Sequence, residues 1–399
     1  MKSGKKITKR SSVGKKILYT FTALLGVAVI LMSCAYGAFY HYYSRMNIVK
    51  DGEDGFEYVS DAQARKGIDL DTDTMTDEEK KELDEIDLNN DNEFVYSEGD
   101  VINVMVLGTD ARLRGRYRTN SDAMVLVSIN KKTKKIVISS FLRDILVDIP
   151  ENKKKKAGKG KLNAAFGYGG AELFFQTFEN NFGVKLDKFV HMDFYSFINI
   201  VNYIGGIDMY IKAEEVKVMN KNYIYEMNMC YCYPPNRGYL PVKSGTFHLN
   251  GIQALAYTRV RYVGGGDFGR TERQRKVIAE IIKKIKMMSA SKLNAFAEKC
   301  LRYVTTNIGQ TDLMSMLIDV PEILDYEQVS VRIPIDKTHH SKKIQGTYVL
   351  VIDLKRNSDY WYNLVYKDKD ISEEIYREME EEKAAKEKAE KQADVSSGT

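Results

Sequence analysis

The chain has 399 residues, of which 44% are hydrophobic, and this apolar content is enough to bury at least one substantial core. Its formal net charge of +5 conceals a strong segregation of charge along the sequence. One of the four cysteines, Cys34, lies in a long apolar run. Cys230 and Cys232 are either paired with Cys300 or free, and the three lack the spacing of a metal site. The cysteines therefore warrant no metal centre and no nucleophile.

The N-terminal residues have the pattern of a signal anchor. Residues 1–16 carry seven Lys and Arg and no acid, and residues 17–40 contain no charged side chain. As a helix the uncharged run covers about 36 Å, which is enough to span a bilayer. The positive-inside rule places the basic flank in the cytoplasm. We therefore predict a cytoplasmic tail over 1–16 and a transmembrane helix over 17–42, with a cleaved signal peptide or a lipidated Cys34 as alternatives.

Residues 43–99 are predicted to form an acidic extracellular stalk. Between residues 51 and 100 there are 19 Asp and Glu against 4 Lys and Arg, which favours a solvated, extended or locally helical segment. Part of it repeats the oxygen-ligand spacing of an EF-hand calcium loop, at Asp87, Asn89, Asp91, Glu93 and Glu98. Because Asn92 stands where that loop expects glycine, calcium binding is the alternative and a plain stalk is the prediction.

From residue 100 to residue 368 the sequence alternates between strand and helix patterns. Strands are predicted at 101–108, 123–130, 135–142, 188–194, 207–211, 328–334 and 347–353. Helices are predicted at 171–182, 195–206, 271–288, 291–304 and 311–325, with an insertion at 213–245. This order predicts a three-layer α/β/α sandwich around a mixed sheet, preceded by one transmembrane helix. Residues 369–399 are predicted to be a charged helical or disordered tail with no apolar face.

Charged residues stand at the ends of the first three predicted strands. Asp110 follows the first strand, Arg118 and Asp122 precede or begin the second, and Arg143 and Asp144 end the third. Each lies at a strand terminus, so these side chains can converge at one edge of the sheet. Two carboxylates beside several arginines can hold a diphosphate together with a divalent ion such as Mg²⁺. Taken singly, each residue is better explained as a turn cap or a surface ion pair.

A later segment gathers guanidinium groups around a glycine loop, at Arg259, Arg261, Arg270 and Arg273, with Gln274 beside them. If AYTRVRY is extended, Arg259 and Arg261 point to one face. On a helix that begins near residue 271, Arg270 and Gln274 share a face because they are four positions apart. Four cations brought together repel one another unless an anion lies between them, and guanidinium forks match phosphate oxygens. The segment therefore predicts a diphosphate site.

Six motifs in order resemble the LytR-CpsA-Psr family: VLGTDAR, RTNSDAMVLVSIN, SFLRD, KLNAAFGYGG, YIGGIDMYI and LNGIQALAYTRVRY with DFGRTERQRKV. The resemblance implies a membrane-anchored phosphotransferase with its N-terminus in the cytoplasm and its catalytic domain outside the cell. Such an enzyme moves an anionic glycopolymer, of the teichoic acid or capsule type, from a polyprenyl-diphosphate carrier to peptidoglycan. It uses Mg²⁺ or Mn²⁺ and binds membrane lipid but no nucleic acid. A non-catalytic cell-envelope regulator that binds a lipid diphosphate is the alternative.

The resemblance also implies roles for individual residues. The expected catalytic residues are Asp122, Arg143, Arg259 and Arg261, and the expected metal ligands are Asp110 and Asp122. The expected diphosphate-binding residues are Arg118, Lys161, Arg259, Arg261, Arg270, Arg273 and Gln274. The chain departs from the family at Ala164, where a histidine is common after the KLN motif, and in the SFLRD motif.

The carrier tail implied by the resemblance requires an apolar channel. Material for such a channel is available in Phe166, Phe174, Phe175, Phe178, Phe182, Phe197 and Ile198. Ordinary core packing explains any single one of these residues better.

Overall fold

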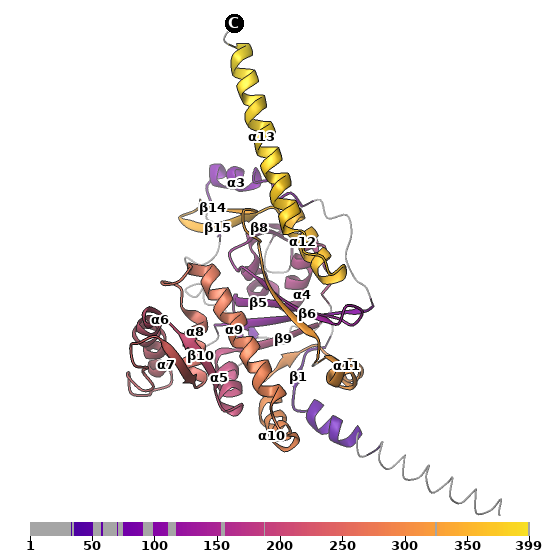
Figure 1. Ribbon diagram of the computed structural model, residues 1–399, viewed down its shortest axis with the longest axis vertical. Coiled ribbons are helices and arrows are strands. Elements are labelled where there is room, and N and C mark those ends of the chain that lie inside the picture. The colour runs from indigo at the N-terminus through magenta and orange to yellow at the C-terminus, as the bar shows by residue number, and fades with distance from the viewer. Residues whose placement is uncertain are drawn as a thin grey trace, which may run out of the picture.

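The protein has an α/β fold built on a mixed sheet of seven strands (Figure 1). The computed structural model describes residues 33, 36–50, 57–58, 70, 75–90, 99–110, 117–152, 156–186, 188–323 and 325–397. The sheet contains β1 (Asn47–Ile48), β3 (Val101–Thr109), β5 (Ser121–Asn130), β6 (Lys135–Phe141), β9 (Lys188–Asp193), β12 (Thr305–Thr306) and β13 (Glu327–Ile333). Their order across the sheet is β1-β12-β9-β3-β5-β6-β13.

The pairing of the central strands brings three chain segments to one edge of the sheet. β3 pairs in parallel with β9 and antiparallel with β5, so the ends of β3 and β9 lie beside the start of β5. In this register Thr109 of β3 lies opposite Asp193 on one side and Ser121 on the other. Asp110 follows Thr109 and Asp122 follows Ser121, so both aspartates lie at this edge of the sheet.

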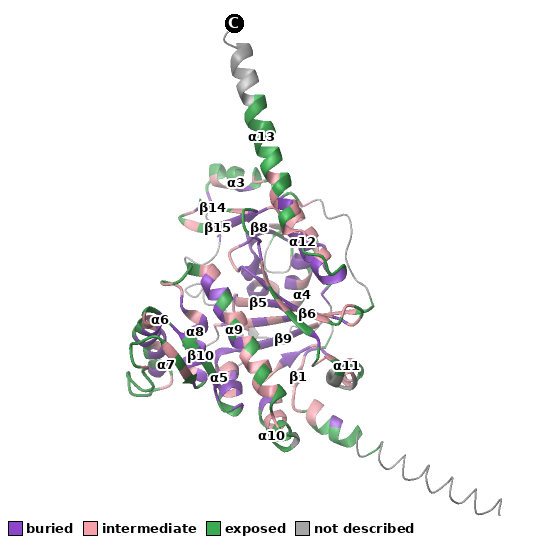
Figure 2. Ribbon diagram, in the orientation of Figure 1, coloured by how far each residue is buried: buried purple, intermediate pink, exposed green. Residues whose placement is uncertain are grey.

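Helices cover both faces of the sheet. The helices α4 (Leu162–Phe182) and α12 (Leu354–Tyr366) pack on one face, where Met105 and Leu107 of β3 are fully buried. On the other face Val106 packs with Ile278 and Ile282 of α9 (Gly266–Lys286). This alternation follows the two-residue period of a strand. Figure 2 shows the burial concentrated in the sheet and the helices beside it. The predicted mixed α/β fold is confirmed.

A second group of elements follows β9 and packs beside the sheet. It contains α5 (Phe194–Tyr203), β10 (Ile207–Ile211), α6 (Ala213–Val218), a π-helical turn (Met219–Ile224), α7 (Tyr225–Cys230), β11 (Gly245–Leu249) and α8 (Gly251–Arg259). β10 and β11 form an antiparallel pair, and their residues share an apolar cluster with α8 and α9. The predicted insertion at 213–245 is thus the arm that carries α6, the π-helical turn and α7.

The remaining elements surround this core. They are β2 (Glu57–Tyr58), α3 (Asp77–Asp84), β4 (Tyr117–Arg118), β7 (Leu146–Ile149), β8 (Gly158–Lys161), α10 (Ala290–Cys300), a 3₁₀ turn (Leu301–Tyr303), α11 (Gln310–Ile323), β14 (His339–Ile344), β15 (Thr347–Ile352) and α13 (Ser372–Ser397).

The segments flanking the sheet pack more closely than their composition predicts. Residues 75–90 belong to the predicted stalk, yet Leu83 of α3 and Leu88 are buried in the main core. Burying a leucine contributes about 1.5–3 kcal/mol, which outweighs the preference of the neighbouring acids for solvent. In the C-terminal tail, Ile375 of α13 is also buried. The expectation that the tail has no apolar face is therefore wrong for its first turns.

The predicted anchor lies largely outside the described residues, as does the basic tail over 1–16. Within the described part of the chain no helix combines the length and apolar character needed to cross a membrane. Residues 36–43, at the end of the predicted span, are helical. The domain boundaries at 16, 42, 99 and 368 stay predictions.

Candidate active site

A cavity of about 800 Å³ opens at the sheet edge where β3 and β5 meet α5, α8 and α9. Its charged and amide side chains include Asp110, Asp122, Arg143, Lys161, Arg259, Arg261, Arg270 and Gln274. Its apolar side chains include Val106, Val125, Phe194, Phe197, Leu255, Val277 and Ile278. Segments more than 160 residues apart in the sequence therefore converge at one place, as the spacing of the motifs predicts.

The polarity of the cavity changes along the elements that line it. On β3 and β5 the acids lie at the sheet edge, whereas Val106 and Val125, which face each other in the strand register, lie deeper. On α9 the polar residue Gln274 comes before Val277 along the same helix. Between the two zones Gly108 lies against Ala123, and a Cβ at Gly108 would come within 3.1 Å of the Ala123 Cβ. The cavity is thus charged at the strand ends and apolar farther along α9.

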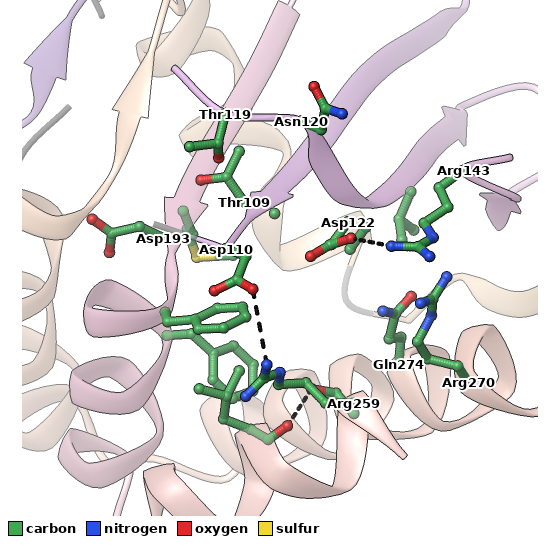
Figure 3. Close-up of a pocket in the computed structure, with 18 of the residues that line it drawn as sticks. Thr109, Asp110, Thr119, Asn120, Asp122, Arg143, Asp193, Arg259, Arg270 and Gln274 are labelled. Carbon is green, nitrogen blue, oxygen red and sulfur yellow. Dashed lines mark hydrogen bonds and ion pairs between the residues drawn. The ribbon is translucent and has the colours of Figure 1, made fainter. Parts of the chain in front are cut away.

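Asp122 is held by Arg143 at the charged end of the cavity (Figure 3). Arg143 Nη1 donates to Asp122 Oδ1 at 2.8 Å, and its Nε contacts Asp144 Oδ2 at 3.3 Å. Lys161 Nζ donates to the other oxygen of Asp144 at 2.8 Å. Burial alone would raise the pKa of Asp144, but the positive charges of Arg143 and Lys161 hold it below its ordinary value. Asp144 therefore stays ionised and fixes both cations beside Asp122.

Asp110 faces Arg259 on the opposite side of the cavity (Figure 3). Their closest charged atoms are 3.8 Å apart, and Arg259 Nη1 also donates to Glu226 Oε2 at 2.7 Å. The guanidinium lies over the rings of Phe194 and Tyr223, 4.8 Å and 5.0 Å from their centroids. Cation–π contacts and two carboxylates hold this arginine in one orientation.

Arg270 is a buried cation in the cavity whose hydrogen-bond donors are only partly paired. Its side chain is 4% exposed, and its nearest acid is Asp267, with Nη2 and Oδ1 3.0 Å apart. The Nε and Nη2 groups of Arg270 make no hydrogen bond to the described residues. Burial, together with the positive charges of Arg143 and Arg261, lowers the pKa of Arg270 to about 10. A bound anion would supply the missing acceptors and relieve the repulsion.

The other predicted clamp residues divide into two groups. Gln274 lies one helical turn after Arg270, and both line the cavity as their spacing predicts (Figure 3). Arg261 also lines it, with Nε 3.5 Å from Asp267 Oδ1. The backbone of Arg118 lies in β4, and the role predicted for its side chain stays a prediction.

Arg273 was predicted to bind the diphosphate, but the structure does not place it in the lining of the cavity. Its side chain is 5% exposed, with Nη1 3.0 Å from Glu215 Oε1. Nη2 donates to the carbonyl oxygens of Val260 at 2.7 Å and Val263 at 3.1 Å. With Glu215 and these carbonyls as partners of its terminal nitrogens, Arg273 anchors the loop before α9, and only its Nε makes no hydrogen bond to the described residues.

The donor set of the cavity fits a small divalent cation. Asp110 and Asp122 both line it, and hard oxygen ligands are what Mg²⁺ prefers. Mg²⁺ is commonly bound through one or two carboxylates, with substrate phosphates and water completing the shell. The described residues contain no group of three or more His, Cys, Asp or Glu side chains that could hold a metal by themselves. The pair therefore fits a metal that is shared with a phosphate ligand.

Residues 63–365 match the LytR_cpsA_psr family. The chain belongs to this family. TagU of Enterococcus faecalis, named as a polyisoprenyl-teichoic acid–peptidoglycan teichoic acid transferase, is 31% identical over 272 residues, covering 67% of this chain and 75% of TagU. Biofilm regulatory protein A of Streptococcus mutans is 32% identical over 257 residues, or 62% of this chain.

Other relatives extend the comparison. TagV of Bacillus subtilis, which carries the same transferase name, is 30% identical over 56% of this chain. The match spans only 59% of the S. mutans protein and 54% of TagV. Among solved structures, B. subtilis TagT is 25% identical with a TM-score of 0.51, covering 69% of this chain and 95% of TagT. TagT bound to LI-WTA is 26% identical with a TM-score of 0.52, over 69% and 95% of the two chains.

The local structure around Arg259 and Arg261 differs from the sequence prediction. AYTRVRY is not extended: α8 ends at Arg259, and Arg261 lies in the loop before α9. The helix is started by a capping box in which the Asn250 side chain accepts from the backbone N–H of Gln253, and Gln253 reciprocates. The two arginines still line the same cavity.

The predicted channel residues are mostly core residues. The four phenylalanines of α4 that are fully or almost fully buried lie in the main core on the opposite face of the sheet from α9: Phe166, Phe174, Phe178 and Phe182. Phe175 packs against the same core and Ile198 is buried beside α8, which leaves only Phe197 lining the cavity. The apolar lining instead comes from the sheet, α5, α8 and α9, which sequence reasoning missed.

Two further residues of the site were missed because they come from the insertion. Glu226 of α7 bonds Arg259, and Tyr223 lines the cavity. A polar, tyrosine-rich insertion gives no periodic signal that points to a cavity. Cys230, Cys232 and Cys300 are free thiols, and burial raises the pKa of Cys300 to about 12.

The predicted calcium loop is only partly described, since residues 91–98 lie outside the described ranges. At its start, the Asp87 side chain accepts from the backbone N–H of Asn89 at 2.8 Å. The Asn89 side chain donates to Asp353 at 2.9 Å, which ties the segment to the start of α12. These contacts give the segment a structural role, and calcium binding there stays a prediction.

Proposed function

We propose that the chain is a phosphotransferase that moves an anionic glycopolymer from a polyprenyl-diphosphate carrier to peptidoglycan. The observation that carries the proposal is the cavity itself, in which Arg143, Arg261 and Arg270 repel one another at one end while the other end is apolar. A lipid diphosphate matches both ends, because its headgroup is anionic and its tail is apolar. The names of TagU and TagV, and the TagT complex with LI-WTA, support this reading for members of the same family.

The mechanism follows from what the side chains offer. The cations of Arg143, Arg259, Arg261 and Arg270 would neutralise and orient the diphosphate, which is the main requirement of phosphoryl transfer. An acceptor sugar hydroxyl then attacks the sugar-side phosphorus. The new phosphorus–oxygen bond forms as the bond to polyprenyl phosphate breaks, and Asp122 is positioned to take the hydroxyl proton.

Asp110 and Asp122 would hold the divalent ion, Mg²⁺ or Mn²⁺, beside the diphosphate. When bound, the ion supplies additional positive charge to the phosphate oxygens. Asp144 would keep Arg143 and Lys161 fixed in place throughout, because both contacts are made without any ligand.

The location of the enzyme is part of the proposal. The basic tail at 1–16 and the uncharged run at 17–40 support a single-pass anchor with the N-terminus in the cytoplasm. The cavity would then lie outside the cell, where peptidoglycan is available and the chromosome is not. Protease access on intact cells tests this placement, and cleavage of the sheet domain only after lysis would contradict it.

Turnover by the purified full-length chain tests the activity. With Mg²⁺, a polyprenyl-diphosphate glycopolymer and peptidoglycan fragments, we expect release of polyprenyl phosphate and a new phosphodiester on the acceptor. Asp122→Ala or Arg259→Ala should each slow release by about 10²–10³-fold, the range found when one transition-state donor is removed. Tight binding of the carrier without release would instead favour a regulator that only binds lipid diphosphate, in line with the name of the S. mutans relative.

A further inference from the structure

The helix at residues 36–43 is tied to one end of the sheet domain. The Tyr42 hydroxyl donates to Asn294 of α10, and His41 Nε2 lies 3.4 Å from Glu298 Oε1. Arg45 reaches the backbone carbonyl of Glu298 at 3.4 Å. β1 then continues into the sheet as the partner of β12. Figure 1 shows this helix beside α10, at the opposite end of the molecule from β14 and β15.

The surface at this end is basic and carries exposed apolar side chains. Residues 283–303 contain six Lys and Arg and one acid. We call the basic face the set of exposed residues Tyr203, Lys283, Lys286, Met287, Lys292, Leu293, Lys299 and Arg302. Within it Met287 is 76% exposed and Leu293 is 43% exposed. Large exposed apolar side chains among lysines are typical of a surface that meets lipid headgroups.

The cavity is oriented towards the same end. Along α9 the charged end of the cavity lies near Arg270 and Gln274, and its apolar part lies near Val277 and Ile278. Continuing in the same direction, α9 reaches Lys286 of the basic face. At 1.5 Å per residue, the axial distance from Gln274 to Lys286 is about 18 Å. The apolar part of the cavity therefore lies between the charged end and the basic face.

We propose that the basic face rests on a membrane surface that contains anionic lipid. Met287 and Leu293 would enter the headgroup region, and the lysines and Arg302 would contact lipid phosphates. The proposal rests on the membrane anchor and lipid carrier of the proposed function, and adds which side of the domain meets the bilayer. It also gives the carrier a short route, because a tail leaving the apolar part of the cavity towards the basic face enters the bilayer directly.

Tryptophan fluorescence tests the docking. The only tryptophan of the chain, Trp361, is 1% exposed and buried beside Ser139, so it provides a constant background. Full-length Leu293→Trp is reconstituted into vesicles of phosphatidylglycerol and brominated phosphatidylcholine, which quenches tryptophans at the headgroup and acyl level. The matched control is Tyr348→Trp, because Tyr348 is 65% exposed and its strand, β15, lies at the opposite end of the molecule (Figure 1).

We expect the added fluorescence of Leu293→Trp to be quenched at least twofold more than that of Tyr348→Trp. Charge reversal by Lys286→Glu with Lys292→Glu should abolish the difference, since each cation near an anionic surface contributes roughly a fivefold factor in affinity. Equal quenching of the two tryptophans would overturn the proposal. It would also be overturned if the reversal weakened binding of a soluble glycerol-phosphate polymer and left quenching unchanged, because the face would then bind polymer.

Failure of this proposal is distinguishable from failure of the anchor or of the enzyme. A chain that does not float with the vesicles lacks the anchor, and the docking falls with it. A chain that floats but shows equal quenching keeps the anchor and loses only the docking. Release of polyprenyl phosphate in the same vesicles reports on catalysis independently of either result.

Discussion

Two arginines three positions apart on α9 are predicted to have opposite effects when replaced: one replacement should lower stability, and the other should lower activity. Arg270 and Arg273 have side chains that are 4% and 5% exposed. Both terminal nitrogens of Arg273 have partners, in Glu215 and backbone carbonyls, and only its Nε makes no hydrogen bond to the described residues. In Arg270, by contrast, both Nε and the terminal Nη2 make none. Methionine has a similar shape without the charge, so Arg→Met at each position separates structural from functional need.

The structure sets the size of the two effects. Arg273→Met leaves Glu215, which is 7% exposed, as an uncompensated buried charge, and removing one partner of such a pair costs about 3–5 kcal/mol. At about 2–4 °C per kcal/mol this lowers the melting temperature by roughly 10 °C. Arg270→Met removes a poorly paired charge that repels Arg143, so we expect unchanged or slightly higher stability. Its transfer rate should fall about 10²–10³-fold.

Thermal unfolding followed by circular dichroism measures the first effect, and release of polyprenyl phosphate measures the second. Lys276→Met on the same helix is the control, because Lys276 is 55% exposed and pairs only with Glu272 among the described contacts. It should change neither quantity. The reasoning is refuted if Arg270→Met melts as early as Arg273→Met, or if it transfers within threefold of the parent chain.

Three other predictions concern the cavity and its support. Glu226→Gln keeps a hydrogen bond to Arg259 and should retain most of the activity. Glu226→Ala loses that bond and should raise the KM for the carrier several-fold more than Glu226→Gln does. Equal KM values for the two variants would contradict a positioning role for Glu226. Asp122→Asn should raise the Mg²⁺ concentration that gives half-maximal activity at least tenfold, as measured in rate titrations. An unchanged half-maximal concentration would show that Asp122 is not a metal ligand. Burial lowers the pKa of His191 to about 3, below the ordinary value near 6.5. Above pH 6.5 the imidazole is neutral in both the folded and the unfolded chain, and the free energy of unfolding is not reduced. As the pH falls from 6.5 towards 3, the unfolded chain binds a proton that the folded chain does not, so stability is lost. Denaturant titrations should show His191→Gln losing less stability over that window, by up to about 5 kcal/mol in the limit.

Much of the fold was predictable because its signals are local. The alternation of β3 and β5, and the glycine after α4, are read directly from the sequence. The capping box of α8 was also readable, with Asn250 and Gln253 in the required spacing. The extended reading of AYTRVRY followed residue spacing alone and overlooked this start signal. The family assignment was confirmed because it rests on several motifs in order rather than on any one element.

Local sequence signals could not predict that two arginines of α9 have different roles, with Arg270 lining the cavity and Arg273 anchoring the loop before the helix. At 100° per residue, Arg273 and Gln274 lie within about 60° and 40° of Arg270 around the helix, so helical spacing puts all three on one side. What separates them is the glycine loop, whose carbonyls at Val260 and Val263 reach Arg273 but not its neighbours. Those acceptors depend on how the chain enters the helix, and Glu215 arrives from the distant α6.

Long-range packing also decides how the cavity treats charge. Glu226 and Tyr223 belong to an insertion, yet they fix the arginine that faces Asp110. An arginine held between two acids keeps its orientation while no ligand is bound, whereas Arg270 lacks that support. The cavity therefore combines one preorganised cation with one that is costly to bury, and an anionic ligand is stabilised by relieving that cost.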